Sequence, residues 1–151
     1  ITMRKIFSAV LLSLSLAGTS AMADNATKEQ AVALVKEAAA AVKGSGKDAV
    51  IKEVNAKDEK WFKGELYLIV LDMSGAHLAH PTNQKLLGKS MLDLPDVDGK
   101  MFRQERVDIA KGKGEGWVDY KYKNPQSGKV EDKTLYVFKQ GDVILSAGIY
   151  K

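Results

Sequence analysis

The chain is organised around a run of six apolar residues, from Leu66 to Leu71. Apolar side chains fill both alternating positions of this run, a pattern typical of a strand that is covered on both faces. The turn signal Asp72-Met73-Ser74-Gly75 follows, and a short second run ends at His80-Pro81. The pattern predicts a β-hairpin over 66–81, to which the downstream segments add further strands.

Helical periodicity precedes the hairpin. Thr27 and Gln30 have the spacing of a capping box, and apolar residues then recur every three or four positions as far as Gly44. We expect a long amphipathic helix with one face in the core. A second, shorter helix follows, for which Asp48 is the expected N-cap.

The longest irregular segment is 83–100. Its leucines argue against disorder, because disordered segments are poor in large apolar residues, and we interpret it as a packed, lid-like loop. Asp98 is the expected cap of a helix over about 100–111. The residues of this helix that should face inward are Met101, Phe102 and Ile109.

Three further strands are predicted near the C-terminus. Residues 117–123 alternate between two faces, the turn 124–128 reverses the chain, and apolar strands follow at 133–138 and 143–150. Two helices, a hairpin, a loop with a helix, and then three antiparallel strands make an α+β domain with a sheet of about five strands.

The first 23 residues have the three parts of a secretory signal peptide. Met3-Arg4-Lys5 is basic, 6–17 is apolar, and Ala21-Met22-Ala23 is a cleavage site. The apolar part is too short for a membrane span, which needs about 20 residues. We therefore expect residues 24–151 to be exported to the periplasm as one domain without a membrane anchor.

Composition and charge exclude several function classes. Loss of Arg4 and Lys5 with the signal peptide lowers the formal charge of +4 by two, and no basic run remains, so a nucleic-acid partner is not expected. There is no cysteine, which excludes disulfides and thiolate metal sites. No cofactor is expected.

Seven short motifs occur along the predicted elements. They are Leu71-Asp72-x-x-Gly75, Ala79-His80-Pro81, Leu87-Gly88-Lys89, Asp96-x-Asp98-Gly99, Gly116-Trp117-x-x-Tyr120, Lys133-x-x-Tyr136-Val137 and Ala147-Gly148-Ile149-Tyr150. In sequence and order they resemble the single Cache domain family, type 2, which comprises PAS-like extracellular sensor modules of bacteria. The resemblance spans nearly the whole of residues 24–151.

The resemblance implies a PAS-like sheet with the long N-terminal helix on one face and a ligand-covering loop and helix on the other. It also implies a pocket between sheet and loop that holds a small organic anion, such as a short carboxylate. The polar residues expected to line this pocket are His80, Tyr120, Tyr122 and Lys133. The expected wall residues are Tyr67, Leu87, Met91, Phe102 and Trp117.

Lys133 is the most informative of these residues. It shares a strand parity with Leu135 and Val137, so its side chain should face inward, where an ammonium group needs an anionic partner. A bound carboxylate would supply one. In the alternative interpretation, Lys133 lies at a frayed strand start and extends into water.

Several polar residues have alternative interpretations. In the alternative interpretation, His80 is an ordinary, partly buried histidine that is bonded to the backbone. His77 and His80 are poorly placed as a metal pair, because residues three apart on a strand point to opposite faces. The spacing from Asp96 to Glu105 follows part of a calcium loop, but the first ligand position falls on Leu94, so no metal site is expected.

Three function classes remain. A sensor would bind the carboxylate and present it to a membrane-bound histidine kinase, chemoreceptor or transporter. An adaptor would present its surface to such a partner without a small ligand. An enzyme would need a nucleophile beside a base, and the sequence has no cysteine, no serine motif and no paired acids beside His80, so we do not expect catalysis.

Overall fold

The computed structural model describes residues 25–151, so the predicted signal peptide, 1–23, lies outside the described residues. Among residues 25–151, each helix is too short or too polar to form a transmembrane span. The elements in chain order are α1 (Lys28–Ser45), α2 (Lys47–Asn55), β1 (Phe62–Lys63), β2 (Leu66–Asp72), β3 (His77–Ala79), the short 3-10 helix η1 (Gln84–Leu86), α3 (Phe102–Lys111), β4 (Glu115–Lys123), β5 (Val130–Gln140) and β6 (Val143–Tyr150).

The strands pair antiparallel in the order β1-β2-β6-β5-β4, with β3 paired to β2 outside this order. The expected α+β fold with an antiparallel sheet is confirmed. The described residues form six strands where about five were expected, because the two-residue β1 was not predicted. The last strand of the chain, β6, lies between β2 and β5.

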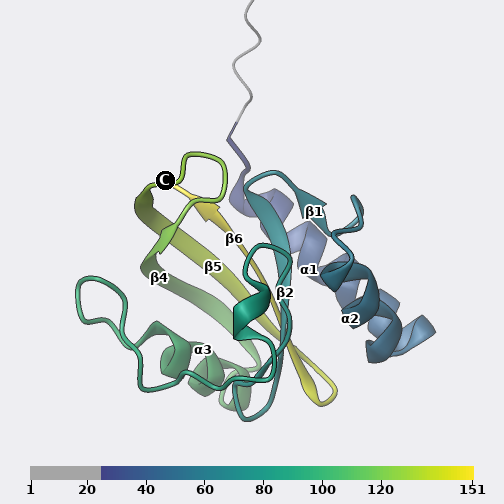
Figure 1. Ribbon diagram of the computed structural model, residues 1–151. Helices are drawn as coiled ribbons and strands as arrows, with labels where there is room; N and C mark the ends of the chain where they lie inside the picture. The colour runs from purple at the N-terminus through teal and green to yellow at the C-terminus, as the bar shows by residue number, and fades with distance from the viewer. Residues whose placement is uncertain (1–24) are drawn as a thin grey trace, which may run out of the picture.

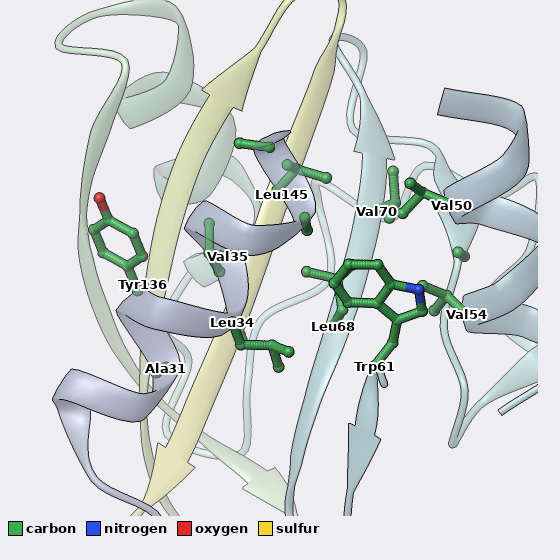
Figure 2. Packing of buried hydrophobic residues seen from close by; sticks show 14 of the residues in the cluster. Ala31, Leu34, Val35, Val50, Val54, Trp61, Leu68, Val70, Tyr136 and Leu145 are labelled. Atoms are coloured by element: carbon green, nitrogen blue, oxygen red, sulfur yellow. The ribbon is translucent and has the colours of Figure 1, made fainter. Parts of the chain in front are cut away.

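Helices α1 and α2 cover one face of the sheet (Figure 1). Thr27 Oγ1 accepts a hydrogen bond from the N–H of Gln30, and the Gln30 side chain accepts one from the N–H of Thr27, which confirms the predicted capping box. Figure 2 shows Val35 of α1 and Trp61 packed in one apolar cluster with Leu68 of β2. Burial of this cluster joins both helices to the sheet.

Helix α3 and the loop before it cover the opposite face (Figure 1). A second apolar cluster there contains Ile69 and Leu71 of β2, Leu135 and Val137 of β5, and Phe102 of α3. Strand β2 thus contributes alternate side chains to both clusters. This is why its sequence is apolar at both parities.

The two expected caps of the later helices are wrong. Gly46 is the N-cap of α2, and Asp48 lies in the first turn of that helix. Asp98 lies before α3, which begins at Phe102. A turn over 96–100 precedes the helix. The carboxylate of Asp96 holds this turn by accepting hydrogen bonds from the backbone N–H groups of Asp98 and Lys100. This turn moves the helix start beyond the position that the sequence predicted.

The segment 83–101 is packed in its first part and open in its last part. Leu86 is buried in η1, and Leu92 packs against the second cluster. Leu94 and Met101 are 43% and 42% exposed. The expectation that Met101 faces inward is wrong, because Met101 is the N-cap residue of α3 and precedes its first turn.

Candidate ligand-binding site

A small cavity lies between the sheet and α3, and its volume is about 10 Å³. The lining combines apolar and aromatic side chains with four basic ones. They lie on β2, on β3 and the residue that follows it, on η1, on α3 and on β4. The lining residues are Ile69, His77, His80, Leu86, Phe102, Arg103, Arg106, Tyr120 and Tyr122.

Lys133 belongs to the same face of the sheet. It is 1% exposed and shares this face with Leu135 and Val137, as its parity predicted. Its Nζ donates hydrogen bonds to Tyr67 Oη at 3.0 Å and to Tyr150 Oη at 3.4 Å. The interpretation of a frayed strand start is wrong, since β5 begins three residues earlier. Burial lowers the pKa of the Lys133 ammonium group, an effect that Tyr67 opposes.

Gly148 of β6 makes room for this lysine. A Cβ atom at position 148 would lie 2.6 Å from the carbonyl oxygen of Thr134 and 2.8 Å from Lys133 Cε. Both distances are shorter than any ordinary carbon contact. The stem of Lys133 therefore crosses β6 over Gly148 and reaches Tyr67 on β2.

Arg106 is the residue of this site that the sequence analysis missed. It lies in α3 one turn after Phe102 and one turn before Ala110, both buried, and is itself 2% exposed. Its Nε has no hydrogen-bond partner among the described residues. Burial lowers the pKa of the guanidinium to about 10, which leaves the group charged at neutral pH. Its position four residues after Phe102, on an apolar helical face, was the available signal.

No carboxylate of the described chain is bonded to either cation. The five ion pairs within 25–151 lie on the surface, and neither Arg106 nor Lys133 takes part in them. The acceptors of Lys133 are phenol oxygens. A buried charge without an opposite charge is unfavourable. The arrangement therefore favours an anion between the sheet and α3.

His80 carries a neutral imidazole in this setting. Its Nδ1 accepts a hydrogen bond from the backbone N–H of Asn83 at 3.1 Å, so the proton of the neutral ring lies on Nε2. Burial, together with the charge of Lys133, lowers the pKa of His80 well below its ordinary value. The bond to the backbone that one interpretation expected is present, and the ring also lines the cavity.

The expectation that His77 and His80 point to opposite faces is wrong. Their ring centroids are 6.0 Å apart, and both rings line the cavity. Strand β3 ends at Ala79, so strand alternation does not extend to His80. His77 Nδ1 donates to the carbonyl oxygen of Lys89 at 3.0 Å, and burial lowers the pKa of His77 to about 4. The described part of the chain contains no group of three or more potential metal ligands.

Aromatic rings form much of the wall. Phe102 stacks on Tyr120 with ring centroids 4.0 Å apart and meets Tyr122 edge-on at 6.4 Å. The ring of Tyr67 lies 5.5 Å from that of His80. Four of the nine predicted site residues, His80, Phe102, Tyr120 and Tyr122, thus line the cavity. Tyr67 and Lys133 do not line it but lie beside it, since Tyr67 neighbours His80 and bonds Lys133.

The other three predicted residues lie elsewhere. Trp117 packs against the cluster under α1 and α2, with its ring 5.3 Å from that of Tyr136, so its assignment to the pocket wall is wrong. Side chains alternate along β4, which places Trp117 and Tyr120 on opposite faces. Leu87 and Met91 do not line the cavity, where the 3-10 turn of η1 places Leu86 instead.

Comparison with known proteins gives one family and two curated relatives. The family model described as Single Cache domain 2 matches residues 13–151. The sensor histidine kinase MctS of Rhizobium johnstonii is 31% identical over 86 residues, which are 56% of this chain and 18% of the kinase. The methyl-accepting chemotaxis protein McpP of Pseudomonas putida is 29% identical over 86 residues, 56% of this chain and 16% of that protein. The chain thus matches less than a fifth of each curated relative.

Solved structures show the same fold over most of the chain. A methyl-accepting chemotaxis protein from Vibrio parahaemolyticus superposes with a TM-score of 0.68 at 25% identity, covering 82% of this chain and 87% of that one. A Cache chemosensory domain, solved to explain carboxylic acid recognition, superposes with a TM-score of 0.68 at 26% identity, covering 81% of this chain and 91% of that one.

Proposed function

The chain belongs to the single Cache domain 2 family, a family of extracellular sensor domains rather than enzymes, and from this premise we propose that it binds a short organic acid. The carboxylate of the acid lies near Arg106 and Lys133, on the face of the sheet that α3 covers. The observation that carries this proposal is the burial of these two cations without a bonded carboxylate among residues 25–151.

A carboxylate would supply the opposite charge that both cations lack. The guanidinium of Arg106 offers paired N–H donors, and the ammonium of Lys133 adds another. Each charge-assisted hydrogen bond of this kind contributes about 1.5 to 3 kcal/mol. The neutral ring of His80 offers its Nε2–H as a further, uncharged donor.

Binding of an acid in this site would move the elements that cover the cavity, which are α3 and the loop before it. A volume of about 10 Å³ holds roughly one water molecule, which is less than a carboxylate needs. Helix α3 or the loop before it would therefore shift outward. Because Asp96 of this loop accepts a hydrogen bond from the N–H of Lys121 at 2.9 Å, the shift would reach the edge strand β4. We propose that a partner protein detects this displacement.

The proposed partner is a membrane-bound signalling or transport protein. The curated relatives are a sensor histidine kinase and a methyl-accepting chemotaxis protein, and the present chain matches only a small part of each. With the predicted signal peptide at 1–23, the site would face the periplasm, where it would present the bound acid to such a partner.

Thermal melting with a panel of short carboxylates tests the proposal. We expect acetate, propanoate or butanoate to raise the melting temperature by several degrees, because ligand at a hundred times its dissociation constant adds about 2.7 kcal/mol to the free energy of unfolding. Arg106→Met should abolish most of this rise, whereas Lys139→Met, at an exposed position of β5, should preserve it. If no carboxylate raises the melting temperature, the proposal is wrong.

A further inference from the structure

A second hollow, open to solvent, lies outside the cavity and shares part of its wall. Its volume is about 190 Å³. Phe102, Arg103 and Tyr122 line both spaces. We call the second hollow the outer groove.

Two exposed valines mark the outer groove as apolar. Val97 of the loop is 70% exposed and Val130 at the start of β5 is 52% exposed, and both line it together with Pro95. They are two of the four large hydrophobic residues exposed within 25–151. Apolar side chains on both sides of a groove gain free energy when an apolar group covers them.

We propose that the outer groove holds the apolar chain of the acid whose carboxylate lies at Arg106 and Lys133. The ligand class is then monocarboxylates with an unbranched chain of about four to six carbons. This inference rests on the proposed function and specifies its ligand. The inner cavity, about 10 Å³, has to open to admit even the carboxylate, so we place the apolar chain of the acid in the larger outer groove, which shares part of the cavity wall. The side chains of Phe102 and Tyr122 line the way and must turn aside.

The size and the charges of the outer groove agree with this class. Its 190 Å³ is far larger than the 10 Å³ of the inner cavity and gives room for several carbon atoms of an acyl chain. Its charged lining residues are Asp96, which accepts hydrogen bonds from three backbone N–H groups, and three cations, Arg103, Lys121 and Lys123. Lys121 forms an ion pair with Asp98, and Lys123 is exposed to water. The buried cations Arg106 and Lys133 have no such compensation, so they favour the carboxylate at the inner end and the apolar chain of the acid in the groove.

Calorimetric titration with acetate, butanoate and hexanoate tests this arrangement. The affinity of the wild type should rise by roughly two- to threefold for each added methylene, somewhat less than full burial of that group gives. Val97→Ser and Val130→Ser should each lower the affinity for hexanoate by roughly three- to tenfold and leave that for acetate unchanged. Leu94→Ser, at a 43% exposed leucine of the same loop that does not line the groove, is the matched control and should change neither.

The outcomes distinguish binding of the acid's apolar chain in the outer groove from binding of its carboxylate at Arg106 and Lys133. If acetate binds and the longer acids bind no more tightly, the inference is wrong and the proposed function stands. The same holds if the affinity of both valine variants still rises with the length of the acid. Adipate, with a second carboxylate in place of the methyl end, should bind more weakly than hexanoate, and tighter binding would overturn the apolar assignment. If none of these acids binds, both proposals fall.

Discussion

Lys133 and Tyr67 meet across a strand that contains neither of them. The lysine Nζ lies 3.0 Å from the tyrosine Oη and 4.3 Å from the centre of its ring, although β6 separates β5 from β2. Burial opposes ionisation of Tyr67, but the nearby ammonium charge lowers the pKa of its phenol. The phenol oxygens bond the ammonium, and the charge of Glu65 also favours it, but no carboxylate within 25–151 forms an ion pair with Lys133.

Replacing Lys133 by methionine should weaken the binding of a short carboxylate by roughly ten- to a hundredfold, because a charge-assisted hydrogen bond is lost. The unliganded variant should melt at or slightly above the wild type, since methionine keeps the bulk of the stem and removes a buried charge. Calorimetric titration and thermal melting measure the two effects. Lys139→Met controls for the loss of a lysine from β5. Binding equal to that of the wild type would place the carboxylate elsewhere.

Gly148→Ala should disturb the path of Lys133. The added Cβ would meet the carbonyl oxygen of Thr134 at 2.6 Å, a backbone atom that cannot turn aside, and the Lys133 stem at 2.8 Å. We expect the free energy of unfolding to fall by about 1 to 3 kcal/mol, as in other overpacked cores. Urea unfolding measures this change. Gly44→Ala, where a Cβ would meet nothing within 4 Å, is the control, and equal effects at both positions would contradict the packing argument.

Most of the fold followed from local patterns. The run 66–71 packs against helices on both sides, as its apolar residues at both parities required, and the capping box at Thr27 begins α1. Trp117 shows where a resemblance misled, because the alternation of β4 itself places Trp117 opposite Tyr120. Its assignment to the pocket came from the family motif and overrode the parity.

Arg106 shows where sequence reasoning stopped short. Its spacing from Phe102 placed it on the apolar face of the helix, but arginine on a helix is usually assigned to solvent, and the packing of α3 on the sheet shows that position 106 is covered. The helix start was also misplaced, because the hydrogen bonds of Asp96 to backbone N–H groups depend on the loop conformation and not on local spacing. Tertiary contacts decided both points.

The free energy of unfolding should decrease on acidification from pH 6.5 to pH 5. The folded-state pKa values of His77, about 4, and of His80 lie below their ordinary value of 6.5, mainly because of burial. In this range the unfolded chain binds protons that the folded chain does not, so stability rises with pH, by at most about 1.4 kcal/mol per pH unit for each histidine. Carboxylates with lowered pKa values, such as Asp72, contribute mainly at lower pH.

Urea unfolding at several pH values measures this dependence. His77→Gln removes one titrating ring and keeps a side-chain donor for the carbonyl oxygen of Lys89, so the slope should fall to about half. A wild type of constant stability between pH 7 and pH 5 would show that neither ring is buried in neutral form.

Removing either Arg106 or Lys133 should reduce the stability that is gained by removing the other. Burial is the main cause of the lowered pKa of Lys133, and the positive charge of Arg106 adds to it, so the two cations repel each other in the unliganded protein. Arg106→Met and Lys133→Met should each raise the free energy of unfolding. The double variant should gain less than the sum of both, by roughly 0.5 to 3 kcal/mol, because the mutual repulsion can be removed only once. Urea unfolding of the four proteins gives this coupling energy directly.

With saturating acetate the order of the four free energies of unfolding should invert, since only the wild type has both cations to bind the carboxylate. Strict additivity without ligand would mean that the two charges lie too far apart to share one carboxylate, and the proposed site would then need a different second cation.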